Sequence, residues 1–171
     1  MNEFKKAIVS GLEEYLSGLY KAIEGLSEAE LNWQPSLESN SIIYLLWHMG
    51  RVEDNWINKV IGGNETVWIR DGWNKKFPFN EEDYGKGYNK QDLANFPSID
   101  KDLVMQFYNE QRKEILKVIE SLSEEDLNKD YKRLTGELKK GYWILGHVIV
   151  EESQHLGQVA YIRGMIKGLD N

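Results

Sequence analysis

The chain has 171 residues, of which 41% are hydrophobic, a formal net charge of −7 and no cysteine. This length fits one domain, taken here as residues 1–171, and buries enough apolar surface to fold without a disulfide or a structural metal. The missing cysteines exclude disulfides, iron–sulfur clusters and thiol nucleophiles, and the acidic balance argues against nucleic acid as the main partner. No apolar run approaches the roughly 20 residues of a membrane span, and acidic residues interrupt the N-terminal segment. We therefore expect no membrane partner, no signal peptide and a cytoplasmic location.

Two segments in the first part of the chain place apolar residues at steps of three and four, the spacing of amphipathic helices. The first runs from Phe4 to Ile23 and the second from Ile42 to Val60. Ser41 or Ser39 is a candidate N-cap of the second segment, and Gly62-Gly63 ends it.

A long connection follows, at about residues 63–97. Its one strand-like run, Thr66–Ile69, is too short to build a sheet. Connections of this length usually carry function or are poorly ordered. The aromatic side chains in it could cover or line a pocket, or could pack as a surface loop. These side chains are Trp68, Trp73, Phe77, Phe79 and Tyr84.

Two more helical segments lie in the second half of the chain. A weaker apolar stripe begins near Ser98 and runs to Leu122, and a further stripe runs from Ile144 to Ile166, with Gly168 as its stop. Helices of this number and length predict an all-α fold, a four-helix bundle with a long loop between its second and third helices.

The two halves of the chain also resemble each other. Ile23–Leu31 is similar to Ile119–Leu127, and Leu45–Met49 is similar to Ile144–Val148. Each half then consists of a helix, a short turn and a helix that carries a histidine, which indicates a duplicated helical hairpin. The alternative is that a common helix-capping sequence occurs twice by chance.

All three histidines lie in the second and fourth predicted helices. On a helical wheel with Ile144 at zero, Glu151 falls at about 340° and His155 at about 20°, both within the apolar stripe. Their i, i+4 spacing puts both side chains on one face. His48 lies on the apolar face of the second helix. A buried, unpaired carboxylate is costly, so this placement requires compensation.

One interpretation is a divalent metal held by His48, Glu151 and His155. Two imidazoles and a carboxylate suit Zn, Fe(II), Ni or Mn, and three protein ligands leave a position open for water or substrate. The alternatives are a buried His–Glu hydrogen bond, or an ion pair between Glu151 and a Lys or Arg of another helix. His147, at about 300° on the same wheel, could pair with Glu151 instead, but we expect it to pack or hydrogen-bond at the edge of the site.

Other polar residues give weaker signals. Glu152 falls at about 80°, on the flank of the stripe, and Ser153 at about 180°, toward solvent, so we predict no nucleophilic triad. The basic pair Lys132-Arg133 is expected to be solvated. Further arginines could reach an anionic substrate, although the sequence does not position them. They are Arg51, Arg70, Arg112 and Arg163.

These residues lie in motifs that resemble the DinB/YfiT-like superfamily, and the resemblance spans nearly the whole chain. The motifs are Leu26-Ser27 with Trp33 and Pro35, Asn40-Ser41-Ile42 with His48-Met49, Val52-Glu53-Asp54 with Trp56, and the late Leu145, His147 and Glu152 followed by His155-x-Gly157-Gln158.

The resemblance implies a bundle, commonly dimeric, with a metal bound by three histidines. It also implies a transferase or isomerase that uses a low-molecular-weight thiol such as bacillithiol or mycothiol. His48 matches the first ligand and His155 the last, whereas the middle position is Glu151. Either Glu151 replaces the imidazole or the site has lost tight metal binding. A carboxylate is a competent ligand, so we favour retention with altered metal preference.

The function expected from the resemblance is thus a divalent-metal-dependent enzyme of the thiol S-transferase type. The metal would lower the pKa of a thiol or water, which then attacks a small electrophile. The alternative is a non-catalytic dimer or small-ligand-binding bundle whose metal site is degenerate. The family's name also suggests DNA damage, but the negative charge argues against nucleic acid. The expected partners are a small-molecule substrate and a second copy of the chain.

Overall fold

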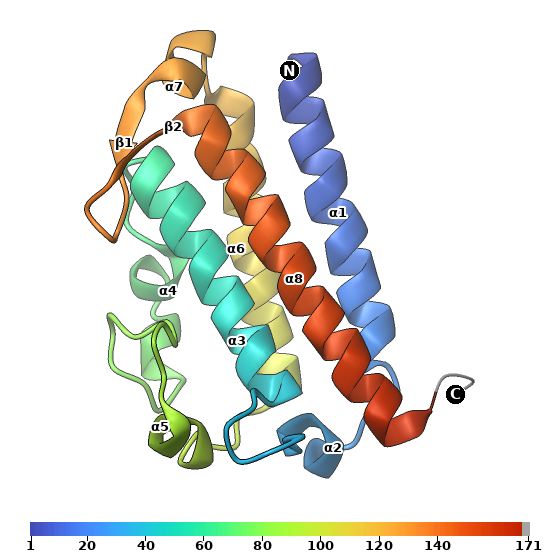
Figure 1. Ribbon diagram of the computed structural model, residues 1–171. Coiled ribbons are helices and arrows are strands. Elements are labelled where there is room, and N and C mark those ends of the chain that lie inside the picture. Colours follow the sequence, from blue (N-terminus) through green and yellow to red (C-terminus); the bar gives the residue numbers. More distant parts are fainter. Residues whose placement is uncertain (169–171) are drawn as a thin grey trace.

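The computed structural model describes residues 1–168 and shows long helices side by side, with short helices and loops at their ends and along one flank (Figure 1). The predicted all-α four-helix bundle is confirmed. Its helices are α1 (Glu3–Ile23), α3 (Ile42–Glu53), α6 (Lys101–Ser121) and α8 (Gly141–Lys167). No helix within residues 1–168 is long and apolar enough to cross a membrane.

Side-chain caps fix where the long helices begin. Asn2 and Ser41 cap α1 and α3, because each side-chain oxygen accepts a backbone N–H from the first turn. Asp100 does the same for α6 and accepts two such bonds, so this helix begins just after Asp100 and not at Ser98. α8 ends at Gly168, whose φ of 83° favours glycine and confirms the predicted stop.

The central helix of the fold is α3, in which every residue is buried. A helix buried all round belongs in the interior of the bundle. It continues as a π-helix, η1 (Asp54–Ile61), which the sequence pattern did not predict. The N–H of Gly62 closes this segment with a 2.8 Å bond to the carbonyl of Ile57, so the predicted glycine stop is correct. π-helical turns are rare and occur frequently at functional sites.

The long connection contains three short helical segments, α4 (Val67–Arg70), η2 (Trp73–Lys75) and α5 (Lys90–Ala94). The strand-like run Thr66–Ile69 is thus largely helical. The carboxylate of Asp54 explains this, since it accepts the N–H groups of Val67 at 3.0 Å and Trp68 at 2.9 Å and so caps α4 from η1.

The aromatic residues of this connection lie in two different environments. Trp68, Trp73 and Phe77 are buried in the hydrophobic core, and Phe79 packs against that core. Tyr84 lines a cavity between α3 and α8. The connection therefore combines both expected roles, a packed segment followed by a wall of the pocket.

A small antiparallel hairpin precedes α8 and was not predicted. Strand β1 (Asp130–Lys132) pairs with β2 (Leu138–Lys140), with Tyr131 opposite Lys139. The turn between them contains Gly136, whose φ of 93° a side chain would disfavour. The hairpin brings the residues of its turn over the end of the bundle next to η1.

The two halves share an order of elements. A short helix follows the first helix of each half, α2 (Glu28–Asn32) after α1 and α7 (Glu124–Asn128) after α6. Ser27 and Ser123 each form a reciprocal capping box with the acidic residue three positions later. The similar sequences thus form similar local structures, and their origin by duplication stays a prediction.

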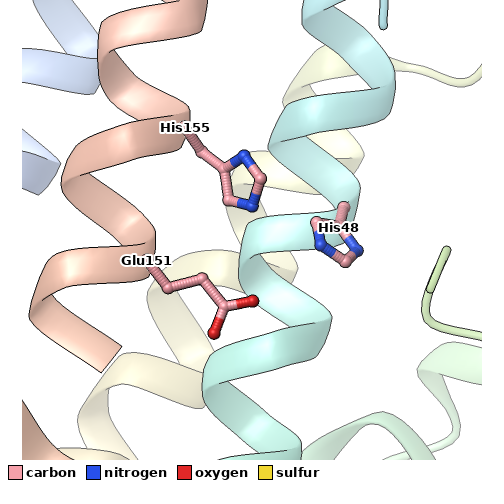
Figure 2. A group of neighbouring side chains, drawn as sticks. All are labelled: His48, Glu151 and His155. Atoms are coloured by element: carbon pink, nitrogen blue, oxygen red, sulfur yellow. The ribbon is translucent and has the colours of Figure 1, made fainter. Parts of the chain in front are cut away.

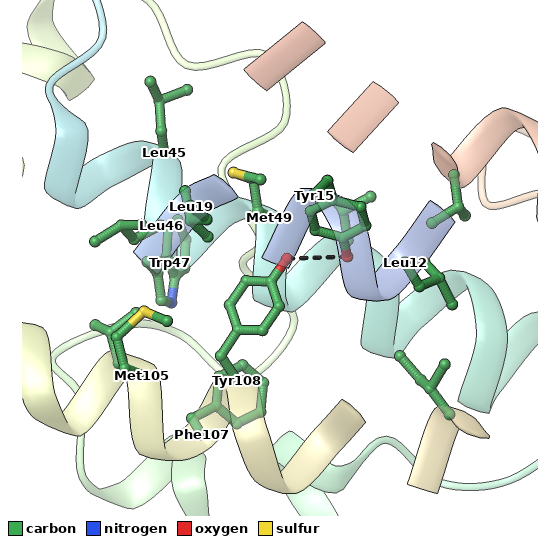
Figure 3. Packing of buried hydrophobic residues seen from close by; sticks show 14 of the residues in the cluster. Leu12, Tyr15, Leu19, Leu45, Leu46, Trp47, Met49, Met105, Phe107 and Tyr108 are labelled. Atoms are coloured by element: carbon green, nitrogen blue, oxygen red, sulfur yellow. Dashed lines mark hydrogen bonds between the residues drawn. The ribbon is translucent and has the colours of Figure 1, made fainter. Parts of the chain in front are cut away.

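The hydrophobic core lies between α1, α3, α6 and α8 (Figure 3). Leu12, Leu45 and Phe107 have no solvent-exposed surface. Within this apolar interior the hydroxyl oxygens of Tyr15 and Tyr108 lie 3.2 Å apart. Buried hydroxyl groups need hydrogen-bond partners, so the interior must hold further polar atoms near this pair.

Candidate metal centre

The structure brings together the residues predicted as metal ligands. Glu151 and His155 extend from α8 toward α3, which carries His48 (Figure 2). One ligand atom from each residue lies within 4.8 Å of the others, and the two imidazole centroids are 5.1 Å apart at 84°. Bonds to one zinc ion are about 2.0–2.2 Å long for nitrogen and oxygen, which puts ligand atoms at most about 4 Å apart. The trio is therefore close to the spacing that one ion requires.

His48 is oriented by a backbone carbonyl. Its Nδ1–H donates to the carbonyl oxygen of Tyr84, which leaves the Nε2 lone pair without that proton. Burial lowers the pKa of His48 from 6.5 to about 4, so the ring is neutral at pH 7. A neutral imidazole with one nitrogen bonded to a carbonyl is the usual state of a metal-ligating histidine.

The carbonyl that orients His48 belongs to a segment fixed on α3, which we call the strap (residues 81–85). Tyr44 donates its hydroxyl to the carbonyl of Gly85 at 2.8 Å. Arg51 donates to the carbonyls of Glu81 and Asp83, each at 3.1 Å. Tyr44, His48 and Arg51 occupy one face of α3, since they are spaced by four and three residues.

Gly85 allows the strap to approach α3 closely. Its φ is 82°, and a Cβ there would lie 3.0 Å from Trp47 and 3.1 Å from both His48 and Tyr44. A side chain at this position would be strained and would push the strap off the helix. The close approach is what places the Tyr84 carbonyl against His48.

Glu151 and His155 lie in a half-buried environment with unsatisfied polar atoms. Burial raises the pKa of Glu151, while the positive charges of Arg133 and Lys86 oppose this rise. Burial lowers the pKa of His155, against a bond to Gln158, and its Nδ1 is buried without a hydrogen-bond partner among residues 1–168. Polar atoms that converge in this way fit a site for a cation better than a closed hydrogen-bond network.

His147 lies beside the trio, as predicted. Its Nε2 is 3.4 Å from Oε2 of Glu151, and its ring stacks on Trp143 with centroids 4.7 Å apart. Burial and the charge of Arg133 lower the pKa of His147, so this contact is not an ion pair at neutral pH. The ion pair between Glu151 and a Lys or Arg, one of the alternatives, does not form in the described part of the chain.

These side chains share a cavity of about 270 Å³ between α3 and α8. The strap and the following glycine-flanked Lys86 form one wall, and the turn of the hairpin, residues 133–135, forms another. Ligand pockets commonly measure about 300–1,000 Å³, so this cavity, just below that range, has room for a small molecule only.

A second group of charged residues, which sequence reasoning missed, lies deeper in the bundle. We call it the buried cluster, and at its centre Glu53 accepts hydrogen bonds from Tyr108 at 2.7 Å and from Arg112 at 2.7 and 3.2 Å. Arg112 also donates to the carbonyl of Leu12 at 2.8 Å and to Tyr15. The cluster consists of Tyr15, Glu53, Tyr108, Gln111, Arg112 and Glu152.

Glu152 corrects the helical-wheel prediction for α8. The buried positions of this helix centre near Val148, so Glu152 has no exposed surface, whereas Glu151 lies at the edge of the buried face. Ile144, the reference of the wheel, is also buried but is not central. Ser153 is exposed as predicted, and its hydroxyl donates to the carbonyl of Ile149 at 2.7 Å.

The basic residues also differ from expectation. Lys132 is exposed, but Arg133 is largely buried and lines the cavity, so the pair is not simply solvated. Arg51 and Arg112 are buried, donate to protein groups and do not line the cavity, which removes them as direct contacts for a substrate. The signal for Arg112 was present in the sequence, since it lies one helical turn after Tyr108 and one before Ile115.

Comparison with known proteins supports the family suggested by the motifs. The family model of the DinB superfamily matches residues 12–159. A solved structure, described as the conserved protein of locus from Enterococcus faecalis, is similar with a TM-score of 0.84 over 99% of both chains and 19% sequence identity. At this identity the likeness shows the fold alone. No match was found among curated proteins. All three histidines lie within the matched region, and the chain belongs to the DinB superfamily.

Proposed function

We propose that this protein is a divalent-metal-dependent enzyme that activates a low-molecular-weight thiol, or water, for attack on a small electrophile. The observation that carries the proposal is the bond from His48 Nδ1 to the Tyr84 carbonyl, because it leaves a neutral imidazole nitrogen next to Glu151 and His155. A structural His–Glu pair would not need this arrangement of three ligand atoms.

The residues present fit a metal with two imidazoles and one carboxylate, for which Zn, Ni, Fe(II) and Mn are all candidates. Three protein ligands leave a coordination position open, and a metal there supplies Lewis acidity that lowers the pKa of a bound thiol or water. Glu151, in the position where the resemblance implies histidine, brings a negative charge that a third imidazole would not.

The chain's own residues supply orientation and proton transfer. The strap holds His48 through the carbonyl of Tyr84. His147 is neutral and lies on the wall, so its ring can accept the proton that a thiol or water loses. In thiol transfer the sulfur–carbon bond forms while the leaving group departs with its electron pair.

The test is an assay of the untagged protein loaded in turn with Zn, Ni, Mn and Fe(II). Each sample receives a low-molecular-weight thiol, bacillithiol or cysteine, and a bimane halide as electrophile. We expect metal-dependent consumption of both reactants, which His48→Ala abolishes. Ser153→Ala, an exposed position on α8, is the matched control and should retain full activity.

A protein that binds metal fully but gives no reaction above the metal-free sample, with thiol or with water, would contradict the enzymatic proposal. That result would favour the second candidate, a non-catalytic bundle that binds a small ligand. We further propose that the protein acts as a homodimer on a small molecule and not on nucleic acid, which sedimentation analysis in the presence and absence of DNA would test.

A further inference from the structure

Arg133, on the wall of the same cavity, is held in place by the hairpin. Its N–H donates to the carbonyl of Glu137 at 2.7 Å, and its own carbonyl accepts from Gly136 at 2.8 Å. Its side chain is only 17% exposed, although it stands in a turn at the end of the bundle. The backbone bonds therefore fix the point from which the guanidinium enters the cavity.

Two tryptophan rings hold the guanidinium group. The Cζ atom of Arg133 lies 4.8 Å from the ring centroid of Trp56 and 5.1 Å from that of Trp143. Cation–π contacts of this kind fix the plane of the group, and its N–H bonds point outward within that plane. Nη1 is engaged with Glu137 at 3.0 Å.

The remaining edge of the guanidinium group carries a hydrogen-bond donor that is not satisfied. Nε of Arg133 is buried and has no hydrogen-bond partner among residues 1–168. A buried donor without a partner is costly and calls for an explanation. The Nε–Nη2 edge of an arginine matches two oxygens of a carboxylate or phosphate with parallel hydrogen bonds.

The charges around the cavity point to the same kind of ligand. Lys86 lines the cavity with Arg133, and both act on the carboxyl group of Glu151 as positive charges. A divalent ion on the trio would add further positive charge to a space of about 270 Å³. A small molecule with a negative group would be attracted by Arg133 and Lys86, against the negative charge of Glu151 in the same cavity, which a divalent ion would neutralise.

We infer that Arg133, assisted by Lys86, binds an oxyanion group, a carboxylate or a phosphate, of the small molecule on which this protein acts. The inference rests on the proposed function for its substrate, but Arg133 binds the oxyanion whether or not the metal is present. It assigns the hairpin a role in substrate selection, separate from that of the metal ligands.

The test uses acetate and inorganic phosphate as separate probes. Each is titrated into the metal-free and the zinc-loaded protein, and the indole N–H resonances of Trp56 and Trp143 are followed by NMR. We expect one of the two anions to shift these resonances to a saturating value in both forms of the protein. The anion that binds more tightly shows whether the substrate group is a carboxylate or a phosphate. Arg133→Gln should weaken its binding at least tenfold.

The matched control is Lys132→Gln, which removes the same charge from the adjacent, exposed position and should leave binding unchanged. Arg133→Lys keeps the charge without the planar edge, so it should bind more weakly than wild type if the edge is used. Unchanged binding in Arg133→Gln, or no saturable shift in the wild type with either anion, would overturn the inference. The zinc content of each sample shows separately whether the metal site, and with it the proposed function, has failed.

Discussion

Glu151 and Glu152 are consecutive residues of α8, yet they belong to two very different polar regions. Glu152 has no exposed surface and joins the buried cluster, in which Glu53 and Arg112 form a hydrogen-bonded ion pair. Glu151 is half-buried beside a cavity, where its carboxylate lies 3.4 Å from the neutral His147. One step of about 100° around the helix separates the two environments.

The comparison separates polar groups that hold the fold together from polar groups that are available to a ligand. In the buried cluster, donors from α6 surround the carboxylate of Glu53, with Tyr108, Gln111 and Arg112 all bonded to it. Within residues 1–168, Oε1 of Gln111 and Oε1 of Glu152 are the atoms of this cluster that have no hydrogen-bond partner. In the candidate metal centre, the ligand atoms approach one another but do not satisfy one another. The paired charges of Glu53 and Arg112 are structural, whereas ligand atoms that converge beside a cavity indicate a functional site.

The largest expected effect is on the buried cluster. Arg112→Met leaves Glu53 buried without its cation, and removing one partner of a buried ion pair typically costs about 3–5 kcal/mol. The free energy of unfolding in urea measures this loss. Lys113→Met, at the adjacent exposed position, should change it by no more than about 0.5 kcal/mol. Equal effects of the two variants would show that the cluster does not stabilise the fold.

The next effect is on metal affinity and separates His155 from His147. His155→Ala removes a ligand and should lower zinc affinity more than about 100-fold, whereas His147→Ala removes a neighbour of the ligands and should cost about tenfold. Competition with a chromophoric chelator measures both. Equal losses would mean that His147 and Glu151 hold the metal and that the assignment of His155 is wrong.

Glu152 provides a pH-dependent test of the buried cluster. Burial, with the charges of Glu53 and Glu151, raises its pKa well above 4.5. Above pH 4.5 the unfolded chain releases this proton while the folded chain keeps it, so stability falls as pH rises, by up to about 1.4 kcal/mol per pH unit. Glu152→Gln should remove this fall. The charged groups that act on Glu152 are Glu53 on α3, Arg112 on α6 and the neighbouring Glu151. Its hydrogen-bond partner is Tyr108 on α6, whose hydroxyl lies next to that of Tyr15 on α1.

The measurement is the free energy of unfolding of wild type and Glu152→Gln from pH 5 to pH 9. If the stability of the two proteins changes with pH in parallel, Glu152 is ionised in the folded protein. The cluster would then hold a second negative charge near Arg112. Glu151→Gln, in the candidate metal centre, is the matched comparison. In the metal-free protein it should change the pH dependence of stability less than Glu152→Gln does, because Glu151 is only half-buried.

The smallest effect concerns the strap. Tyr44→Phe removes the hydroxyl bond to the Gly85 carbonyl, worth about 1 kcal/mol net, while it keeps the ring that stacks on His48. We expect zinc affinity to fall by a few-fold because the Tyr84 carbonyl is held less firmly. Tyr20→Phe, an exposed site on α1, is the control. A wild-type affinity in Tyr44→Phe would show that the strap does not orient His48.

The long helices and the grouping of the three candidate ligands could be predicted because both depend on local periodicity. Apolar spacing locates α1, α3, α6 and α8, and the i, i+4 spacing of Glu151 and His155 places two ligands on one face. His48 could be predicted for the same reason, because it is a polar residue on the apolar stripe of its helix. The wheel also favoured His155 over His147, and the resemblance to the superfamily then matched His48 and His155 to its first and last ligands.

The rest depends on contacts between segments far apart in the chain. The bond from His48 to Tyr84 and the cap of α4 by Asp54 join positions that no periodicity connects. The wheel for α8 was centred on Ile144, so a rotation of a few tens of degrees exchanged the environments of Glu151 and Glu152. Arg133 was placed at the cavity by a hairpin whose strands are too short to give a sequence signal.

The metal content of the untagged protein, measured by elemental analysis beside His48→Ala, tests the claim that the trio is a metal centre. We expect about one equivalent of a divalent metal in the wild type, as for a single three-ligand site, and none in the variant. Absence of metal from the wild type, even after incubation with Zn, Ni, Mn and Fe(II), would contradict the claim. So would equal occupancy in both proteins, because His48 would then not be a ligand.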